Sequence, residues 1–482
     1  MAPAKFTSGS TMRHVVTMTA AGGLGLITLF LVDALNLFYI SLLGHRELAA
    51  AIGFAGTVQF FMISMAIGLS IAATAVVSRA VGAGDTAGAH RLGASSLTLL
   101  VAVLGAAAAL AWLGRGHALD LLGATGETRA IASRFLAITL PSLPGIGIAM
   151  IAGGLLRAVG DARRAMFITL SSGAVAAVLD PILIFGLGLG IDGAALAQVL
   201  TRVMMALIAL RFAVLVRDLV GRIDLRAALS DARPILAIGL PAVATQLSTP
   251  FGNAFLTGVV AVHGDAAVAG WAVVGRLTPL AFGAIFALSG AVGPILGQNR
   301  GAGRFDRIRM AYRDALVFSC GWVLSVWLLL WLATDAIIRG FNLAGPGVEV
   351  LATFTHLGAG AFLFTGALFI SNAAFNNLGR PALSTLFNWS RDGVAIPVLA
   401  LLIGGTAGTG GVVLMQAGAA LVVGSLAALT AWRYVGHLSR TAAAPEAVPL
   451  PQPAFASGRT ALAAQMAAEE SPSALAPDRD SR

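Results

Sequence analysis

The chain has 482 residues, of which 57% are hydrophobic and 11% charged, and its mean hydropathy is +0.87. Soluble domains carry about 25% charged residues, so this composition excludes a soluble domain, and it also excludes a disordered or fibrous chain. The net charge of +9 fits basic loops at a membrane surface better than nucleic-acid binding, and a lone cysteine, Cys320, excludes an internal disulfide.

Twelve apolar runs are long enough to cross a bilayer as helices. They cover residues 15–44, 50–81, 93–113, 130–156, 164–187, 193–216, 234–262, 266–297, 314–334, 350–378, 381–404 and 410–434. We therefore predict an all-α membrane protein with twelve transmembrane helices. Its expected parts are an N-terminal tail at 1–14, an N-lobe at 15–218, a linker at 219–233, a C-lobe at 234–436 and a disordered tail at 437–482.

The basic residues predict the orientation of the chain. If both termini are cytoplasmic, 23 of the 31 Lys and Arg residues lie inside, five lie outside and three lie within spans. The three within spans are Arg202, Arg276 and Arg391. This bias is the positive-inside pattern, and the first residues lack a signal-peptide cleavage pattern. We expect a multi-pass protein of the inner (plasma) membrane with both termini in the cytoplasm.

The sequence is internally duplicated. The turn Gly82-Ala83-Gly84 after the second span recurs 219 residues later as Gly301-Ala302-Gly303. The turns at Gly160 and Gly379, after the fourth and tenth spans, are separated by the same offset. Because each copy has six spans, an even number, the copies enter the membrane in the same direction. Two parallel lobes of this kind predict a carrier whose substrate binds between them near the middle of the membrane.

Three acids lie deep in the predicted spans: Asp33, Asp180 and Asp392. A charged side chain at the bilayer centre costs about 3 kcal/mol, so each is a functional candidate. Asp33 and Asn36 share a helix face. Pro181 lacks an N–H, which frees a carbonyl one turn earlier and predicts a bend beside Asp180. A carboxylate next to a free carbonyl can hold a proton or a small cation.

The repeat positions of Asp33 and Asp180 are Gly252 and Leu399, which are not acidic. The copies therefore differ where ion chemistry is expected, which argues for function over a polar link between helices. As neighbours on an α-helix, Arg391 and Asp392 do not share a face, and either can pair with another span in a structural or a functional role.

Other candidates concern the substrate cleft. Arg276 is either a counter-ion in the cleft or a brace within its lobe. Phe61 and Met65 of the second span can contact a flat lipophilic substrate, although packing against lipid or core explains them better. Gly188 to Gly193 fits G-x-G-x-x-G, but no strand precedes it, so no dinucleotide site follows. We expect no enzyme activity, no metal site and no cofactor beyond H⁺ or Na⁺ as coupling ion.

The residues also carry a family resemblance. The run from Val159 to Met166, and the run from Val178 to Gln198 with its Leu-Asp-Pro signature, resemble the fourth-to-sixth-span region of multidrug and toxic compound extrusion (MATE) antiporters. The resemblance covers about residues 15–436. It implies two V-shaped lobes and an exporter in which proton or sodium entry drives drug exit.

Some positions depart from the family pattern. The family's first-span acid falls at Asn36, whereas this chain has Asp33 one turn earlier. Ala176 stands where many relatives have Asn, and Gln198 stands where Thr is frequent. The second-lobe acids of the NorM-like branch are absent from the seventh and tenth spans. The pattern is closer to the DinF (DNA-damage-inducible) branch, which implies proton coupling in the first lobe.

We therefore predict a proton-coupled antiporter that exports lipophilic, often cationic compounds by alternating access. Asp33, Asn36, Asp180 and Gln198 are its predicted cation-coupling residues. A sodium-coupled exporter is one alternative. Another is a lipid-linked glycan flippase, which needs a more cationic cleft than Arg276, with Arg202 and Arg391, provides. The expected partners are the bilayer and a small substrate, without nucleic acid, and we expect a monomer.

Overall fold

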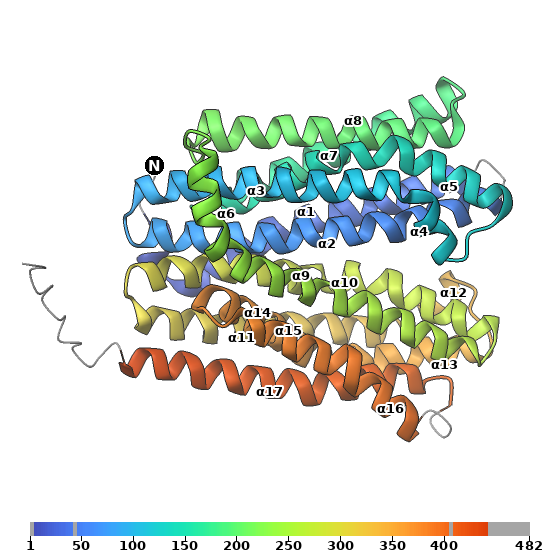
Figure 1. Cartoon of the computed structure of the whole chain (residues 1–482). Coiled ribbons are helices and arrows are strands. Elements are labelled where there is room, and N and C mark those ends of the chain that lie inside the picture. The colour runs from blue at the N-terminus through green and yellow to red at the C-terminus, as the bar shows by residue number, and fades with distance from the viewer. Residues whose placement is uncertain (1–3, 42–45, 404–407, 442–482) are drawn as a thin grey trace, which may run out of the picture. The chain divides into compact units, whose positions relative to one another are not determined.

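A computed structural model describes residues 4–41, 46–403 and 408–441, and in these ranges the chain is helical without a β-strand (Figure 1). Met1–Ser439 forms one compact unit, which holds the helical bundle, and Arg440–Arg482 forms a second. The predicted tail at 437–482 lies outside the described residues apart from its first positions, which continue the last helix to Thr441.

The first lobe contains helices α1 to α8, and the second contains α9 to α17 (Figure 1). The elements of the first lobe are η1 (Lys5–Thr7), α1 (Thr11–Ser41), α2 (Arg46–Gly82), α3 (Thr86–Leu113), α4 (Arg115–Leu121), α5 (Gly126–Thr139), η2 (Leu140–Ser142), α6 (Leu143–Ala158), α7 (Ala162–Pro181), η3 (Ile182–Gly186), α8 (Gly190–Leu210) and η4 (Arg211–Val216). Those of the second lobe are α9 (Leu225–Ala261), α10 (Asp265–Gly301), α11 (Phe305–Leu332), α12 (Thr334–Gly340), α13 (Pro346–Thr353), η5 (Phe354–Gly358), α14 (Phe362–Leu378), α15 (Pro381–Trp389), η6 (Ser390–Ala395), α16 (Ile396–Ile403) and α17 (Gly411–Thr441).

The number of spans agrees with the sequence. Among the described residues, 11 helical stretches are long and apolar enough to cross a membrane. A helix pair bent by 62°, Pro346–Gly358 and Phe362–Leu378, supplies the twelfth span. The predicted linker at 219–233 is shorter than expected, because α9 already begins at Leu225. Asp224 caps it there, since its carboxylate accepts hydrogen bonds from the N–H groups of Arg226 and Ala227 at 2.8 and 3.4 Å.

The duplication is visible in the helix boundaries. α2 and α10 begin at Arg46 and Asp265 and end at Gly82 and Gly301, which repeats the offset of 219 residues at both ends. The boundaries of α3 and α11, and of α4 and α12, are related in the same way. Gly84 and Gly303 have φ values of 75° and 67°, a backbone conformation that glycine adopts without strain. This requirement explains why the Gly-Ala-Gly turn occurs in both copies.

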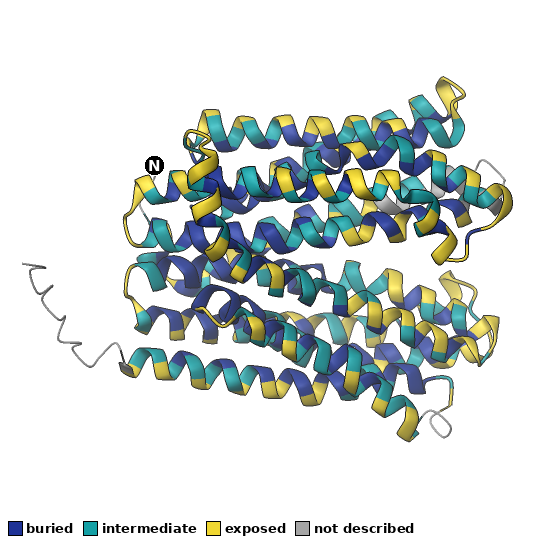
Figure 2. Cartoon of the chain, viewed as in Figure 1, coloured by how far each residue is buried: buried dark blue, intermediate teal, exposed yellow. Residues whose placement is uncertain are grey.

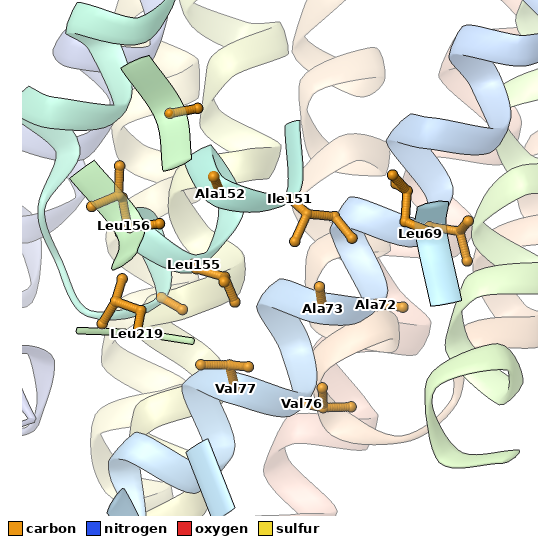
Figure 3. Close-up of a cluster of buried hydrophobic side chains, with 14 of the residues drawn as sticks. Leu69, Ala72, Ala73, Val76, Val77, Ile151, Ala152, Leu155, Leu156 and Leu219 are labelled. Atoms are coloured by element: carbon orange, nitrogen blue, oxygen red, sulfur yellow. The ribbon is translucent and has the colours of Figure 1, made fainter. Parts of the chain in front are cut away.

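The helices α2 and α10 lie at the centre of the bundle. In their most apolar windows 61% and 72% of the residues are buried, against 22% for α3 and for α11, so the latter two are peripheral (Figure 2). The first-lobe core forms where α2 packs on α6, with Ala73 and Val77 on one side and Ile151 and Leu155 on the other (Figure 3). Leu219 packs against this cluster from the connection to the second lobe (Figure 3).

One end of the bundle is closed by close packing between the lobes. We call the end at which α2 reaches Gly82 and α10 reaches Gly301 the turn end. A Cβ atom on either glycine would overlap the backbone of the other lobe, at Gln298 and Arg79 respectively. Glycines at these positions therefore allow the two helices to cross in contact.

The N-terminal segment, residues 5–9, joins both lobes at the turn end. The N–H of Phe6 donates to Oε1 of Gln298 at 2.9 Å, and Arg307 donates to the carbonyl of Phe6 at 3.0 Å, both in the second lobe. Lys5 Nζ donates to the carbonyl of Gly160 in the first lobe at 3.1 Å. The Phe6 side chain is 1% exposed, so this segment is part of the packed interior.

Candidate functional site

The lobes meet along one face of α2 and the matching face of α10. Both faces follow the seven-residue spacing of two helices packed side by side. In α2 the face consists of Thr57, Phe61, Ser64, Gly68, Ile71, Ala75, Ser78 and Gly82. In α10 it consists of the residues 219 positions later: Arg276, Leu280, Gly283, Ala287, Gly290, Pro294, Gly297 and Gly301.

The half of these faces nearer the turn end is closed. Ser78 is fully buried, and a Cβ at Gly297 of the opposite lobe would overlap it. A Cβ at Gly68 would overlap Val243 of α9, and one at Gly22 of α1 would lie 3.2 Å from the Cβ of Ala287. Small residues on these faces thus hold the lobes in contact.

The other half of the same faces is open. Phe61 is 51% exposed and its repeat partner Leu280 is 50% exposed. A Cβ at Gly56 of α2 or at Gly275 of α10 would meet no described atom within 4 Å. Because the faces are continuous with the closed half, we interpret their exposure as a separation of the lobes. We call the exposed part of the two faces the cleft, and the end of the bundle opposite the turn end the open end.

The cleft contains two of the three predicted substrate residues. Phe61 and Arg276 lie on the exposed parts of the two matching faces. Met65, the third, is half-buried and packs against the first-lobe core, as the packing interpretation expects. Within the described part of the chain Arg276 makes no hydrogen bond or ion pair, so in this conformation it does not brace its lobe. The sequence did not single out the cleft residue Thr57, although the seven-residue spacing of small side chains in both copies would have identified the face.

Two of the four predicted coupling residues are in contact. Asn36 of α1 donates from Nδ2 to Oδ2 of Asp180 in α7 at 3.1 Å, and Asp180 is 3% exposed. Small residues bring the two helices together, because Gly173 of α7 packs against Thr28 of α1. Asp33 belongs to α1, but its side chain lies outside the described residues.

The chain stays helical at Pro181, where the sequence predicts a bend. α7 runs through Pro181 and continues as the wider π-helix η3. Such π-helical turns are frequent at functional sites, and this one begins at Ile182, two residues after Asp180.

Gln198 of α8 makes no hydrogen bond with Asn36 or Asp180 in the described ranges, and its buried Oε1 has no hydrogen-bond partner there. An unpaired buried acceptor is costly, so this oxygen has the capacity to bind a donor or a cation. One turn further along α8, the buried Arg202 donates to the carbonyl of Thr139 and the hydroxyl of Ser142, both at 3.1 Å, and to Gln59. Its partners are neutral oxygens from three other elements, and sequence analysis did not find them.

Arg391 and Asp392 bind each other, which corrects the expectation that neighbours do not share a face. Nε and Nη2 of Arg391 donate to the two carboxylate oxygens of Asp392 at 2.7 and 2.9 Å, and both side chains are buried. The residues lie in the π-helix η6, whose wider turn rotates successive residues by less than an α-helix does. Arg391 also reaches Thr249 of α9 at 3.4 Å, so the ion pair is anchored inside the second lobe.

The second lobe also contains an acid that the predicted boundaries excluded. The broken span begins at Pro346 rather than at 350, so it includes Glu349. The Glu349 carboxylate accepts a hydrogen bond from the N–H of Gly410 at 3.1 Å and another from Thr409. It is exposed at the open end and ties α13 to the start of α17.

A sequence profile described as MatE matches residues 23–182 and 241–401, one segment in each lobe and together most of the chain. The chain belongs to the MatE family. The two matched segments reflect the duplication, and membership of the MatE family makes the chain a membrane transporter of the multidrug efflux type rather than an enzyme.

Named relatives and solved structures agree with this assignment. The chain is 25% identical over 385 residues to the "FAD transporter" of Shewanella oneidensis, covering 79% of this chain and 85% of that protein. It is 26% identical over 375 residues to the "Multidrug export protein MepA" of Staphylococcus aureus, covering 76% and 82%. A solved outward-facing conformation of a multidrug resistance MATE family transporter has the same fold, with a TM-score of 0.84, 24% identity and coverage of 91% and 99%.

Proposed function

We propose that this MatE-family chain exchanges protons for lipophilic, often cationic compounds and exports them by alternating access. The observation that carries the proposal is the pairing of buried Asp180 with the amide of Asn36. An amide satisfies a hydrogen bond but supplies no charge. A buried carboxylate with this partner keeps its charge uncompensated until it takes up a proton or another cation. Neutralising the buried charge therefore favours cation binding in the first lobe.

The proposed orientation places the turn end in the cytoplasm. Both Gly-Ala-Gly turns, the start of α1 and the Arg-rich connection from Arg211 to Arg233 lie at this end (Figure 1). The positive-inside rule then puts the open end outside the cell. In this orientation the structure is open to the outside, like the solved transporter with the same fold, and opening inward separates the contacts of Phe6, Gly82 and Gly301.

In the proposed cycle, proton and drug favour different states of one cleft. A proton from the outside neutralises Asp180, or Asp33 on the same helix as Asn36. The protonated site favours closure of the open end after the drug has left. Once the turn end opens, the proton leaves to the cytoplasm and the cleft accepts the next drug molecule. The proposal places coupling in the first lobe, as in a DinF-like transporter.

The glycan flippase interpretation loses support. It needs several cations in the cleft for a pyrophosphate, but Arg202 and Arg391 are buried and bound to other side chains. Arg276 remains as an exposed cation among the three arginines in spans.

A second candidate concerns the charge of the substrate. Arg276 is exposed on the cleft face without a partner among the described residues, and one relative is named an FAD transporter. A single exposed guanidinium favours an anionic aromatic compound such as a flavin nucleotide over a cation. Substrate charge is therefore the property that separates the two candidates.

The test is transport by the purified chain in vesicles with an imposed pH gradient. Lipophilic cations and flavin nucleotides serve as substrates, each with sodium present or absent. The proposal expects movement of lipophilic cations that follows the pH gradient in sodium-free buffer. If transport strictly requires sodium, the coupling ion is sodium rather than the proton. If only flavin nucleotides move, the second candidate is favoured. Gradient-driven transport that persists in both Asp33→Asn and Asp180→Asn refutes coupling by the first lobe.

A further inference from the structure

A second hollow lies on the first lobe, away from the cleft. It is a groove of about 400 Å³ between α7 and the end of α8 with η4. Arg164, Phe167 and Ser171 of α7 line one side, and Ile208, Arg211 and Phe212 line the other. The spacing of the α7 residues, three and then four positions, places them on one helix face.

The groove is polar at its mouth and apolar below. α7 starts at the turn end, so Arg164 lies near that end and Ser171 lies about 10 Å deeper along the helix. α8 runs in the opposite direction, so Arg211 lies near the turn end and Ile208 lies deeper. The two cations thus stand side by side at the level where a membrane helix leaves the hydrocarbon.

The mouth of the groove has a surplus of positive charge. Asp161 receives hydrogen bonds from both Arg164 and Arg217, so one carboxylate serves two guanidinium groups. Arg211 is exposed, and it has no hydrogen bond or ion pair with any residue that the structure describes. Together these four side chains leave two uncompensated positive charges beside the groove.

The walls of the groove match hydrocarbon. Phe167, three positions deeper than Arg164, is 54% exposed, and Ile208, three positions deeper than Arg211, is half-buried. Both lie on helices that cross the membrane, so their exposed surface contacts lipid. A ligand that fills this groove has an apolar tail and an anionic head.

We propose that this groove is a binding site for an anionic phospholipid of the leaflet at the turn end. Its phosphate lies between Arg164 and Arg211, and an acyl chain follows Phe167 and Ile208. Charge complementarity selects the head group, because a zwitterionic lipid carries its own cation beside the phosphate. The site is independent of the proposed transport function, since it requires only that α7 and α8 cross the membrane.

The full-length chain, purified in detergent, tests the site by native mass spectrometry. Phosphatidylglycerol and phosphatidylcholine with the same acyl chains are titrated separately, and glycerol phosphate serves as a soluble anion. We expect phosphatidylglycerol to bind at least tenfold more tightly than phosphatidylcholine, and glycerol phosphate to bind at least tenfold more weakly than phosphatidylglycerol.

Variants distinguish a site from diffuse attraction. Arg211→Gln is expected to weaken phosphatidylglycerol binding at least fivefold. The matched control is Arg163→Gln, an exposed arginine at the start of α7 that does not line the groove, with an expected loss below twofold. Ile208→Trp fills the groove without changing charge and is expected to weaken binding at least fivefold. Equal losses in both arginine variants, equal binding of the two lipids, unchanged binding in Ile208→Trp, or full-strength binding of glycerol phosphate overturns the proposal.

Discussion

Asp180 in the first lobe and Asp392 in the second are both buried acids of membrane spans; Asp180 lies shortly before the π-helix η3, and Asp392 lies within the π-helix η6. Their partners differ in charge. Asp392 is neutralised by Arg391 through two hydrogen bonds, whereas Asp180 is held by the neutral amide of Asn36. An acid that already has its cation contributes to structure, and an acid without one is available to bind an ion from outside. Under the proposed function, the partner of each acid, rather than its burial, separates a structural role from a coupling role.

The largest expected effect tests the first half of this comparison. Asp180→Asn keeps the size and the hydrogen bonding of the side chain but removes the charge that takes up a cation. We expect transport driven by a pH gradient in vesicles to fall at least tenfold, with little change in the thermal unfolding of the purified chain. The control is Asp120→Asn, an exposed acid in α4 outside the spans, which should transport normally.

The next effect tests the second half. Asp392→Asn leaves the buried guanidinium of Arg391 without its counter-ion, and we expect a loss of about 3–5 kcal/mol of stability in detergent. Replacing both residues, with Arg391→Met and Asp392→Leu, should restore most of that loss and retain pH-driven transport. A double variant that folds well but no longer couples transport to protons would show that this pair shares the coupling role.

Packing around the pair gives a smaller effect. A Cβ on Gly252 of α9 would lie 3.0 Å from the Cβ of Asp392, so Gly252→Ala pushes directly on the ion pair. Overpacking of this kind costs about 1–3 kcal/mol, to be read from unfolding in detergent. Gly258→Ala on the same helix is the matched control, because a Cβ there meets no described atom within 4 Å. Equal behaviour of the two variants would contradict tight packing at the pair.

The smallest effect concerns Asp161, an acid just outside the spans that accepts hydrogen bonds from two arginines. Burial raises the pKa of Asp161, but hydrogen bonds from Arg164 and Arg217 outweigh it and lower the pKa overall. A lowered pKa stabilises the fold above the unfolded pKa of about 3.9, and that contribution disappears as the pH falls through the folded value. Asp161→Asn, which keeps a good helix cap, should cost about 1 kcal/mol at pH 7. Unfolding curves should show the difference vanishing below about pH 4, and a difference that grows in acid would reverse this assignment.

Much of the fold follows from the sequence because its causes are local or repeated. Apolar length gives the spans, and the offset between Gly82 and Gly301 gives the duplication that the helix boundaries repeat. The sequence assigned Asn36 and Asp180 to the same site but did not predict that they touch. They are 144 residues apart, and no local pattern reports a contact over that separation.

Other features depend on geometry that the sequence does not display. The pairing of Arg391 with Asp392 arises from a π-helix, and π-helices have no spacing signature comparable to the α-helical period. The oxygen ligands of Arg202 come from α2, α5 and η2, which only the packed lobe brings together. The broken tenth span begins at Pro346 and so includes Glu349, whereas the apolar run from which the span was predicted begins only at residue 350.

The N-terminal segment has a consequence for biosynthesis. The hydrogen-bond partners of Phe6, Gln298 and Arg307, leave the ribosome later than Phe6 because they follow it by 292 and 301 positions. At about 5–20 residues per second, their synthesis takes about 15–60 s. During that time Phe6 lacks both of these partners in the second lobe. Final assembly of the turn end is therefore expected to be a late event in synthesis.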